Sequence, residues 1–119
     1  MPQQLIYKIS SKQAWKHAQE KGVFKGAEID LKDGFIHFSN AAQVAETAAK
    51  HFNGQADLIL AAIDANALGD ALKYEISRGN DLFPHLYADL SMDAVVWTKE
   101  LPLGENGAPR VPTLDGGNG

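Results

Sequence analysis

The sequence predicts a single α+β domain in which two helices in the N-terminal half pack on a small, bent and mostly antiparallel sheet. Three observations favour this class. The chain has 119 residues, of which 45% are hydrophobic, which suits one domain with one core. Strand and helix patterns alternate in the first half, whereas the second half has mostly strand patterns. The predicted domain covers residues 1–114, and Asp115–Gly119 is a predicted flexible tail.

The first predicted strand, Leu5–Ile9, leads directly into a helix. Its β-branched and aromatic residues favour the strand. Ser10, with Gln13 three residues later, has the capping-box pattern of a helix start, and Gly22 ends the apolar stripe of this helix. Trp15 lies in that stripe and is predicted to anchor the core.

A loop over Gly26–Lys32 precedes the second predicted strand, Asp33–Ser39. Side chains alternate between the two faces of a strand. Phe35, His37 and Ser39 are therefore expected on one face, which brings two polar side chains together.

The second predicted helix begins at Asn40, with Gln43 in the reciprocal capping position, and ends at Gly54. Residues Asp57–Asp64 are almost continuously apolar, which is typical of a central strand buried on both faces. A buried helical turn has the same pattern. Ala65–Ala71 follows as a turn with a helical piece.

The remaining segments are predicted to be mostly strands. Leu72–Ile76 alternates, with Glu75 on the opposite face to its two neighbours. Leu82–Tyr87 contains Pro84, which lacks a backbone donor and so favours an irregular or edge segment. Ala94–Thr98 is the last predicted strand.

Composition and motifs exclude several classes of protein. The absence of cysteine excludes disulfides, thiolate nucleophiles and zinc–thiolate sites. With 11 basic and 15 acidic residues, the chain lacks the basic surface of a DNA-binding protein, although an RNA partner stays open. No apolar run reaches the length of a membrane span and no signal-peptide pattern is present, so we expect a cytoplasmic protein without a membrane partner. No nucleotide-loop or metal motif occurs, and we expect no metal.

Two of the four histidines lie in similar surroundings. His37 occurs in Phe-Ile-His-Phe-Ser and His85 in Phe-Pro-His-Leu-Tyr, so each is flanked by aromatic residues and followed by a hydroxyl, that of Ser39 or Tyr87. One interpretation is a cleft lined by His37, Ser39 and His85. The other is that both histidines are buried and bonded to the backbone, while Ser39 only caps the next helix.

At these residues the sequence resembles a known family. The similar positions are Ile6–Ile9, Trp15, Ala18, Asp33–Ser39, Gln43–Val44, Thr47–Ala48, Leu58, Ile63–Asp64, Tyr74–Glu75, Phe83–Tyr87, Leu101–Leu103, Gly107 and Pro112. Together they resemble the uncharacterised family known as domain of unknown function 952, over nearly the whole chain. By fold, that family is grouped with the ADP-ribosyltransferases and the RNA 2′-phosphotransferases, which use NAD. The resemblance therefore implies an ADP-ribosyltransferase-like fold.

The resemblance also implies a nucleotide site. His37-Phe38-Ser39 is similar to the His-x-Ser or His-x-Thr motif with which that superfamily holds two riboses, with Phe38 where glycine is common. NAD or an ADP-ribose-like nucleotide is the implied ligand, held at its ribose and diphosphate by His37 and Ser39. Lys8 is the basic residue chosen for the phosphates, and its alternative interpretation is an exposed charge at a strand end.

The implied catalytic group is Glu75 or His85, which would handle the proton or the ribose hydroxyl. Tyr87 is expected to stack on nicotinamide or a base. The first functional hypothesis is thus an enzyme that transfers or hydrolyses a ribosyl group. The second is a non-catalytic module that binds a small ligand or a peptide, and the third is an RNA-processing factor. The oligomeric state stays open.

Overall fold

The computed structural model describes residues 4–77, 80–112 and 114. Its elements are β1 (Leu5–Ser11), α1 (Lys12–Lys21), β2 (Val23–Phe24), α2 (Glu28–Asp33), β3 (Ile36–His37), α3 (Val44–His51), β4 (Leu58–Asp64), the 3₁₀ helix η1 (Ala65–Ala71), β5 (Leu72–Ile76), β6 (Leu82–Leu86), β7 (Leu90–Ser91), the 3₁₀ turn η3 (Met92–Ala94) and β8 (Val95–Leu101). The predicted α+β class is confirmed. The prediction of one bent sheet is wrong, because the described strands form three small antiparallel sheets, β1-β4-β8, β2-β7 and β3-β6-β5.

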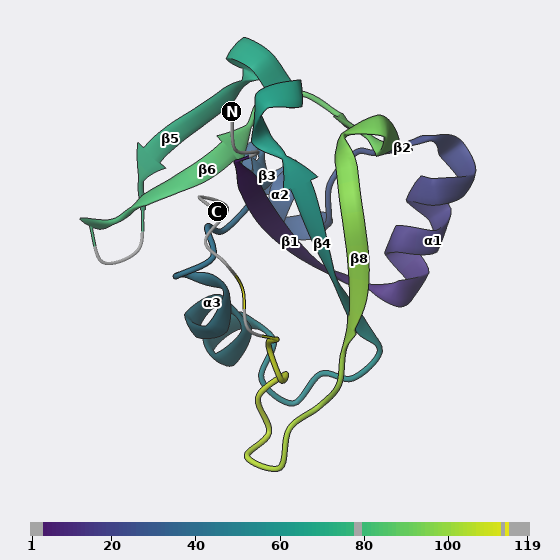
Figure 1. Ribbon diagram of the computed structural model, residues 1–119, viewed down its shortest axis with the longest axis vertical. Coiled ribbons are helices and arrows are strands. Elements are labelled where there is room, and N and C mark those ends of the chain that lie inside the picture. The colour runs from purple at the N-terminus through teal and green to yellow at the C-terminus, as the bar shows by residue number, and fades with distance from the viewer. Residues whose placement is uncertain (1–3, 78–79, 113, 115–119) are drawn as a thin grey trace.

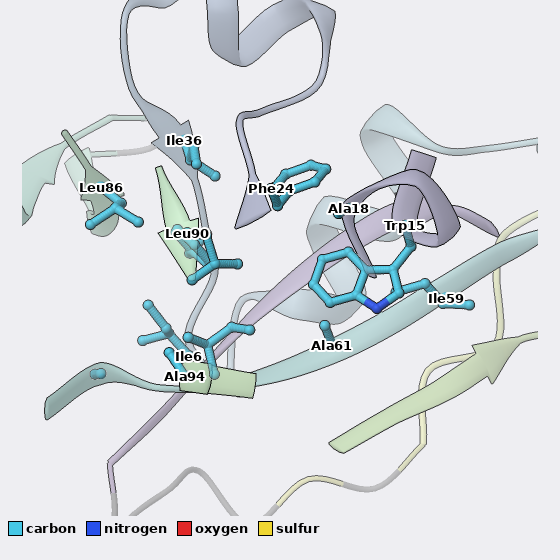
Figure 2. Packing of buried hydrophobic residues seen from close by; sticks show 13 residues of the cluster. Ile6, Trp15, Ala18, Phe24, Ile36, Ile59, Ala61, Leu86, Leu90 and Ala94 are labelled. Atoms are coloured by element: carbon cyan, nitrogen blue, oxygen red, sulfur yellow. The ribbon is translucent and has the colours of Figure 1, made fainter. Parts of the chain in front are cut away.

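The central strand of the molecule is β4, as the continuous apolar run predicted. Ile59, Ala61 and Ile63 point into one core cluster, and Leu58 and Leu60 into the other, which is the alternation of a strand buried on both faces. The first cluster joins β4 to α1, β2, β6 and β7, and it includes Trp15, which is buried as predicted (Figure 2). The second joins β4 to α3 and the C-terminal segment. In Figure 1, α1 and α3 accordingly lie on different sides of the central sheet.

A corner at Phe38 connects the central sheet to the β3-β6-β5 sheet. Ile36 and His37 pair with β6, whereas Ser39 exchanges both backbone hydrogen bonds with Tyr7 of β1. The chain thus changes partner strand within two residues. The predicted strand Asp33–Ser39 is therefore wrong as one continuous element, and only Ile36–His37 is β3.

The structure corrects two helix predictions. Ser11, not Ser10, caps α1: its Oγ accepts a hydrogen bond from the N–H of Ala14. The predicted end at Gly22 is confirmed by its left-handed φ of 80°. The predicted loop at Gly26–Lys32 is wrong, because it contains most of α2, which has six residues and is too short to show a helical period.

The predicted start of the second helix at Asn40 is wrong, because α3 begins at Val44 and its N-cap is Gln43, which makes no side-chain capping bond. The predicted reciprocal bonds between Asn40 and Gln43 are present and close the turn that precedes α3. The Asn40 N–H donates to Oε1 of Gln43, and the Gln43 N–H donates to Oδ1 of Asn40. The regular helix then runs over Val44–His51, with Phe52 as its C-cap, and so ends three residues before the predicted Gly54.

The prediction of an edge or irregular segment at Leu82–Tyr87 is wrong, because β6 is the central strand of its sheet. On the β5 side, Pro84 lies opposite Tyr74 in a pair without backbone hydrogen bonds. The ladder bonds are made by the pairs on either side of it, Lys73–His85 and Glu75–Phe83. Its nitrogen therefore faces β3, where Phe38 donates to the Pro84 carbonyl and Pro84 has no N–H to return. The proline ends the β3 ladder after His37, and β6 keeps its central position.

The last part of the chain turns back along the core. Leu103 and Pro109 form an isolated bridge, and Val111 and Leu114 pack against the second cluster. The predicted tail, Asp115–Gly119, lies outside the described residues. None of the helices in the described part of the chain has the length and apolar character needed to cross a membrane.

Candidate functional site

One face of the β3-β6-β5 sheet collects four of the side chains that the sequence singled out, His37, Glu75, His85 and Tyr87. His37 lies directly opposite His85 in the β3–β6 register. Because the neighbouring Phe38–Pro84 pair carries a hydrogen bond, His37 and His85 form a non-hydrogen-bonded pair, the kind that brings side chains closest. Their ring centroids are 5.5 Å apart. The predicted proximity of the two histidines is therefore confirmed.

Phe35 lies among the rings of this face. It stacks on His85 at a centroid distance of 4.1 Å and an interplanar angle of 28°. The rings of His37 and Tyr87 are 4.6 Å and 5.2 Å from it. We call Phe35, His37, Glu75, His85 and Tyr87 the two-histidine cluster. Phe35 was predicted on this face but was given no role.

Glu75 connects strand β5 to the two-histidine cluster. Its Oε1 lies 2.8 Å from Nδ1 of His85 and accepts a 2.7 Å hydrogen bond from the Tyr87 hydroxyl. The bonds from Tyr87 and His85 lower the pKa of Glu75, so this carboxylate is ionised near neutral pH. The same bond to Glu75 raises the pKa of Tyr87. A single carboxylate oxygen thus orients two further groups of the cluster.

The bond to Glu75 also selects the tautomer of His85. A carboxylate oxygen accepts from Nδ1–H, so in the neutral ring Nε2 carries the lone pair. The His85 side chain is only 6% exposed, whereas Glu75 is 40% exposed. The pair therefore has the arrangement in which a carboxylate orients a histidine as a general base.

His37 is held differently, by two carboxylates of α2. Its Nδ1 lies 2.5 Å from Oδ1 of Asp30, and its Nε2 lies 2.9 Å from Oδ2 of Asp33. Both ring nitrogens of His37 are thus engaged within the protein.

Asp30 is the buried centre of this arrangement, at 2% exposure. It also accepts from the backbone N–H groups of Ala27 and His37 and from the ammonium of Lys8. Burial alone would raise the pKa of Asp30, but the bond from His37 and the charge of Lys8 outweigh it and hold the pKa well below its usual range.

Lys8 lies in the middle of β1 and is 6% exposed, so its interpretation as an exposed charge at a strand end is wrong. Its Nζ donates to both carboxylate oxygens of Asp30 and to the carbonyl of His37, at 2.9–3.1 Å. Burial lowers the pKa of Lys8, and the charge of Asp30 opposes this effect. Since an ammonium has three donors, none is left for a phosphate.

Ser39 does not join the cluster through a hydrogen bond to either histidine in the described part of the chain. Its Oγ lies 3.0 Å from Oγ1 of Thr47 on α3. Strand alternation predicted that Ser39 shares a face with His37, but the change of partner strand at Phe38 interrupts that alternation. The structure thus brings together His37, Glu75, His85 and Tyr87 and leaves Ser39 beside α3.

Sequence reasoning missed Asp30 and Asp33 as members of the site. The available signal was weak: Asp30 is the third residue of a six-residue helix that ends at Gly34. Nothing in the pattern connects it with Lys8, which lies 22 residues earlier. Gly26 offers a second weak signal, because its φ is 115° and a Cβ there would lie 2.8 Å from the Cβ of Asp30.

The donor set does not form a metal centre among the residues that the structure describes, since no three His, Asp or Glu side chains converge there on one point. A shallow hollow of about 230 Å³ lies elsewhere, lined by residues of η1, β7 and η3 and by Leu86, but by no residue of the two-histidine cluster.

Solved structures of one bacterial protein are similar to the whole fold. The X-ray crystal structure of protein CC0527 from Caulobacter crescentus is 49% identical, with a TM-score of 0.87, over 89% of this chain and 93% of that chain. The solution NMR structure of CC0527 is 49% identical, with a TM-score of 0.81, over 89% of this chain and 91% of that chain. No curated protein matches the sequence.

The family model described as "Protein of unknown function (DUF952)" matches residues 9–98. The match includes every residue of the two-histidine cluster together with Asp30 and Asp33. It confirms the family that the residues around His37 and His85 resembled, and the chain therefore belongs to the DUF952 family.

Proposed function

We propose that the two-histidine cluster binds NAD or an ADP-ribose-like nucleotide and transfers or hydrolyses its ribosyl group. The observation that carries the proposal is the Glu75 carboxylate, which accepts from both His85 and Tyr87 beside stacked aromatic rings. An ionised carboxylate next to a histidine with a free lone pair matches the chemistry of breaking a glycosidic bond. The grouping of the family with ADP-ribosyltransferases supports the ligand class.

The reaction assigns separate tasks to the two catalytic groups. Cleavage of the bond between ribose C1′ and the nicotinamide nitrogen leaves the bonding electron pair on neutral nicotinamide and builds positive charge on the ribose. Glu75 stabilises that charge. His85 Nε2 takes the proton from the water or acceptor hydroxyl whose oxygen forms the new bond to C1′. Tyr87, which is 47% exposed, stacks on the base.

The bonding pattern revises the roles proposed for three other residues. His37 is bonded to Asp30 and Asp33, so it forms a wall of the site and donates nothing further from its ring nitrogens. Lys8 holds Asp30 and the carbonyl of His37 in place. Ser39 contacts α3 and supports the corner between the sheets. In this proposal the ligand is held mainly through stacking and through its ribose.

The first test is an amide chemical-shift titration of labelled protein with NAD and, in parallel, with ADP-ribose. We expect shifts clustered at Phe35, His85 and Tyr87, and release of nicotinamide from NAD by chromatography. Glu75→Gln is expected to lower turnover by about 100-fold or more with little change in affinity, because it removes charge stabilisation made in the transition state.

The matched control is Glu100→Gln. Glu100 is an exposed carboxylate on strand β8 of the central sheet, where it pairs with Lys12 of α1. The substitution should leave both binding and turnover unchanged. The absence of shifts at millimolar NAD and ADP-ribose would remove the nucleotide proposal.

A second candidate function is a non-catalytic module that binds a small ligand or peptide on the same face. The observation that favours it is the saturation of Lys8 and His37 by internal bonds, which leaves few cationic donors for a diphosphate. Shifts at the cluster without release of nicotinamide, and a Glu75→Gln variant with unchanged behaviour, would favour this module over the enzyme.

A further inference from the structure

The outer edge of β5 is an open strand edge in the described part of the chain. β5 pairs with β6 on one side, and no described strand pairs with the other. In Figure 1 the β5–β6 hairpin projects from the body of the molecule with β5 on the outside. Open edges of this kind accept a further strand.

The hydrogen bonds of the hairpin fix which backbone groups face outward. The Tyr87 N–H donates to Ala71, and the Ser77 N–H donates to Asp81. Since bonded pairs alternate in an antiparallel ladder, Lys73 and Glu75 point their backbone groups toward β6. The N–H and C=O groups of Leu72, Tyr74 and Ile76 consequently point away from the hairpin.

Apolar side chains accompany these outward groups. Tyr74 is 42% exposed and Ile76 is 69% exposed, and they lie on the same face of β5. Leu82, which is opposite Ile76 on β6, is 53% exposed. Such contiguous apolar residues beside an open edge are typical of an interaction surface.

We propose that this edge pairs with the β5 edge of a second copy of the chain, antiparallel and centred on Tyr74. In that register Lys73 lies opposite the partner's Glu75 and Glu75 lies opposite the partner's Lys73, while Leu72 lies opposite the partner's Ile76. The charge pairs occupy non-hydrogen-bonded positions, where facing side chains come closest. The outward groups of Tyr74 and Ile76 and the carbonyl of Leu72 supply the hydrogen bonds between the two strands, whereas the Leu72 N–H already donates to the Gly69 carbonyl.

Charge selects this register over its neighbours. A two-fold axis through Lys73 would put two lysines opposite each other, and an axis through Glu75 would put two glutamates opposite each other. Like charges directly opposite destabilise a strand pair. The register centred on Tyr74 pairs opposite charges and also uses all five residues of β5.

The pairing has a consequence for the two-histidine cluster. Lys73 and Glu75 lie on the same face of β5 as His85, and the charge of Lys73 already lowers the pKa of Glu75. The partner's Lys73 brings a second cation to Glu75, whereas the nearby ammonium of Lys8 is bonded internally. A role of the partner's Lys73 in ligand binding rests on the proposed function. The dimer itself does not depend on that function.

Sedimentation equilibrium of the whole chain, from micromolar to millimolar concentration, tests the pairing without any ligand. We expect the wild-type chain to dimerise. Lys73→Glu or Glu75→Lys alone should weaken the dimer affinity by about tenfold, because each substitution creates two pairs of like charges across the strand pair. The double variant Lys73→Glu/Glu75→Lys restores the opposite pairs and should recover most of the dimer affinity. Lys16→Glu, at an exposed position of α1, is the matched control and should have no effect.

A mixed sample of labelled and unlabelled chains locates the contact. An isotope-filtered NOE between the Hα of Lys73 and the partner's Glu75 Hα is expected, since α-protons face each other in non-hydrogen-bonded pairs. A chain that stays monomeric at millimolar concentration overturns the proposal. A dimer whose affinity is unchanged by both single charge reversals also overturns it, as does a double variant whose dimer is weaker than that of either single variant. None of these readouts depends on NAD. Failure of the proposed function therefore leaves the strand pairing testable, and failure of the pairing leaves the proposed function testable.

Discussion

At the scale of single residues, Asp30 organises the buried polar part of the molecule. Its carboxylate accepts from Lys8, from the His37 ring, and from the backbone N–H groups of Ala27 and His37. The bond to Ala27 also caps α2, which lacks a capping side chain at its N-cap. One side chain therefore links β1, α2 and β3 and sets the orientation of His37.

We expect Asp30→Asn to lower the free energy of unfolding by about 3 kcal/mol or more, because it leaves the Lys8 ammonium buried without a counter-charge. Urea denaturation measures the change. Asp89→Asn is the matched control, since Asp89 forms an exposed pair with Lys25 and such pairs contribute about 0–1 kcal/mol. Equal effects of the two substitutions would contradict the organising role of Asp30.

The same carboxylate makes stability depend on pH. The pKa of Asp30 is lowered in the folded protein from an ordinary value of 3.8, so at acid pH the unfolded chain binds a proton more readily. Its contribution is complete well above that value and is lost as the pH falls below about 4. The free energy of unfolding of the wild type should fall as the pH is lowered from about pH 5 to pH 2. The free energy of unfolding of Asp30→Asn should fall less steeply over the same range. Parallel curves for the two proteins would argue against this assignment.

At the scale of elements, backbone donors determine where helices and strands begin and end. Pro84 stops the β3 ladder because it has no N–H to return to Phe38, yet the β5 side of β6 is undisturbed. The first helix begins one residue later than its capping pattern predicts. Ser10 is buried within β1, and its hydroxyl donates to the Ser11 carbonyl, whereas the Ser11 Oγ is free to accept from Ala14.

We expect Ser11→Ala to lower the free energy of unfolding by about 1 kcal/mol, because the first turn of α1 loses its capping acceptor. Ser11→Gly should cost only a few tenths of that, since glycine also suits the N-cap. Thermal and urea unfolding followed by circular dichroism compare the two variants. A glycine variant as unstable as the alanine variant would point to a lost contact other than the cap.

At the scale of the whole molecule, β4 joins two core clusters into one cooperative unit. Leu60 and Ile63 are fully buried on its opposite faces, each in a different cluster. Every described element therefore packs, directly or through a neighbour, on this strand. The sheet β3-β6-β5, which carries the two-histidine cluster, is attached to it through the Tyr7–Ser39 bridge and through Ile36 and Leu86 in the first cluster.

We expect Leu60→Ala and Ile63→Ala each to lower the free energy of unfolding by about 2–5 kcal/mol, because each leaves a cavity beside a packed strand. Both variants should still unfold in one transition when intrinsic fluorescence and circular dichroism are compared. Val96→Ala, at a site that is 41% exposed, is the control and should change stability little. Two separate transitions in either core variant would show that the clusters are independent.

The sequence by itself determined the local structure wherever one short pattern dominates. The apolar run of β4, the strand at Leu72–Ile76, the reciprocal bonds of Asn40 and Gln43, and the stop at Gly22 depend on neighbours a few residues away, and each is present in the structure. The same holds for family membership, which the residues around His37 and His85 carried. The α2 helix escaped prediction because six residues show no period.

Only the tertiary structure decided how the site is assembled. It paired His37 with His85, joined Glu75 to both His85 and Tyr87, and separated Ser39 from them at the Phe38 corner. It also buried Lys8 beside Asp30, whereas the sequence left a phosphate-binding residue and an exposed charge as the two interpretations. The physical reason is that a buried charge is stable only next to its partner. That partner lies in another element, where strand register and packing, rather than any local pattern, bring the two together.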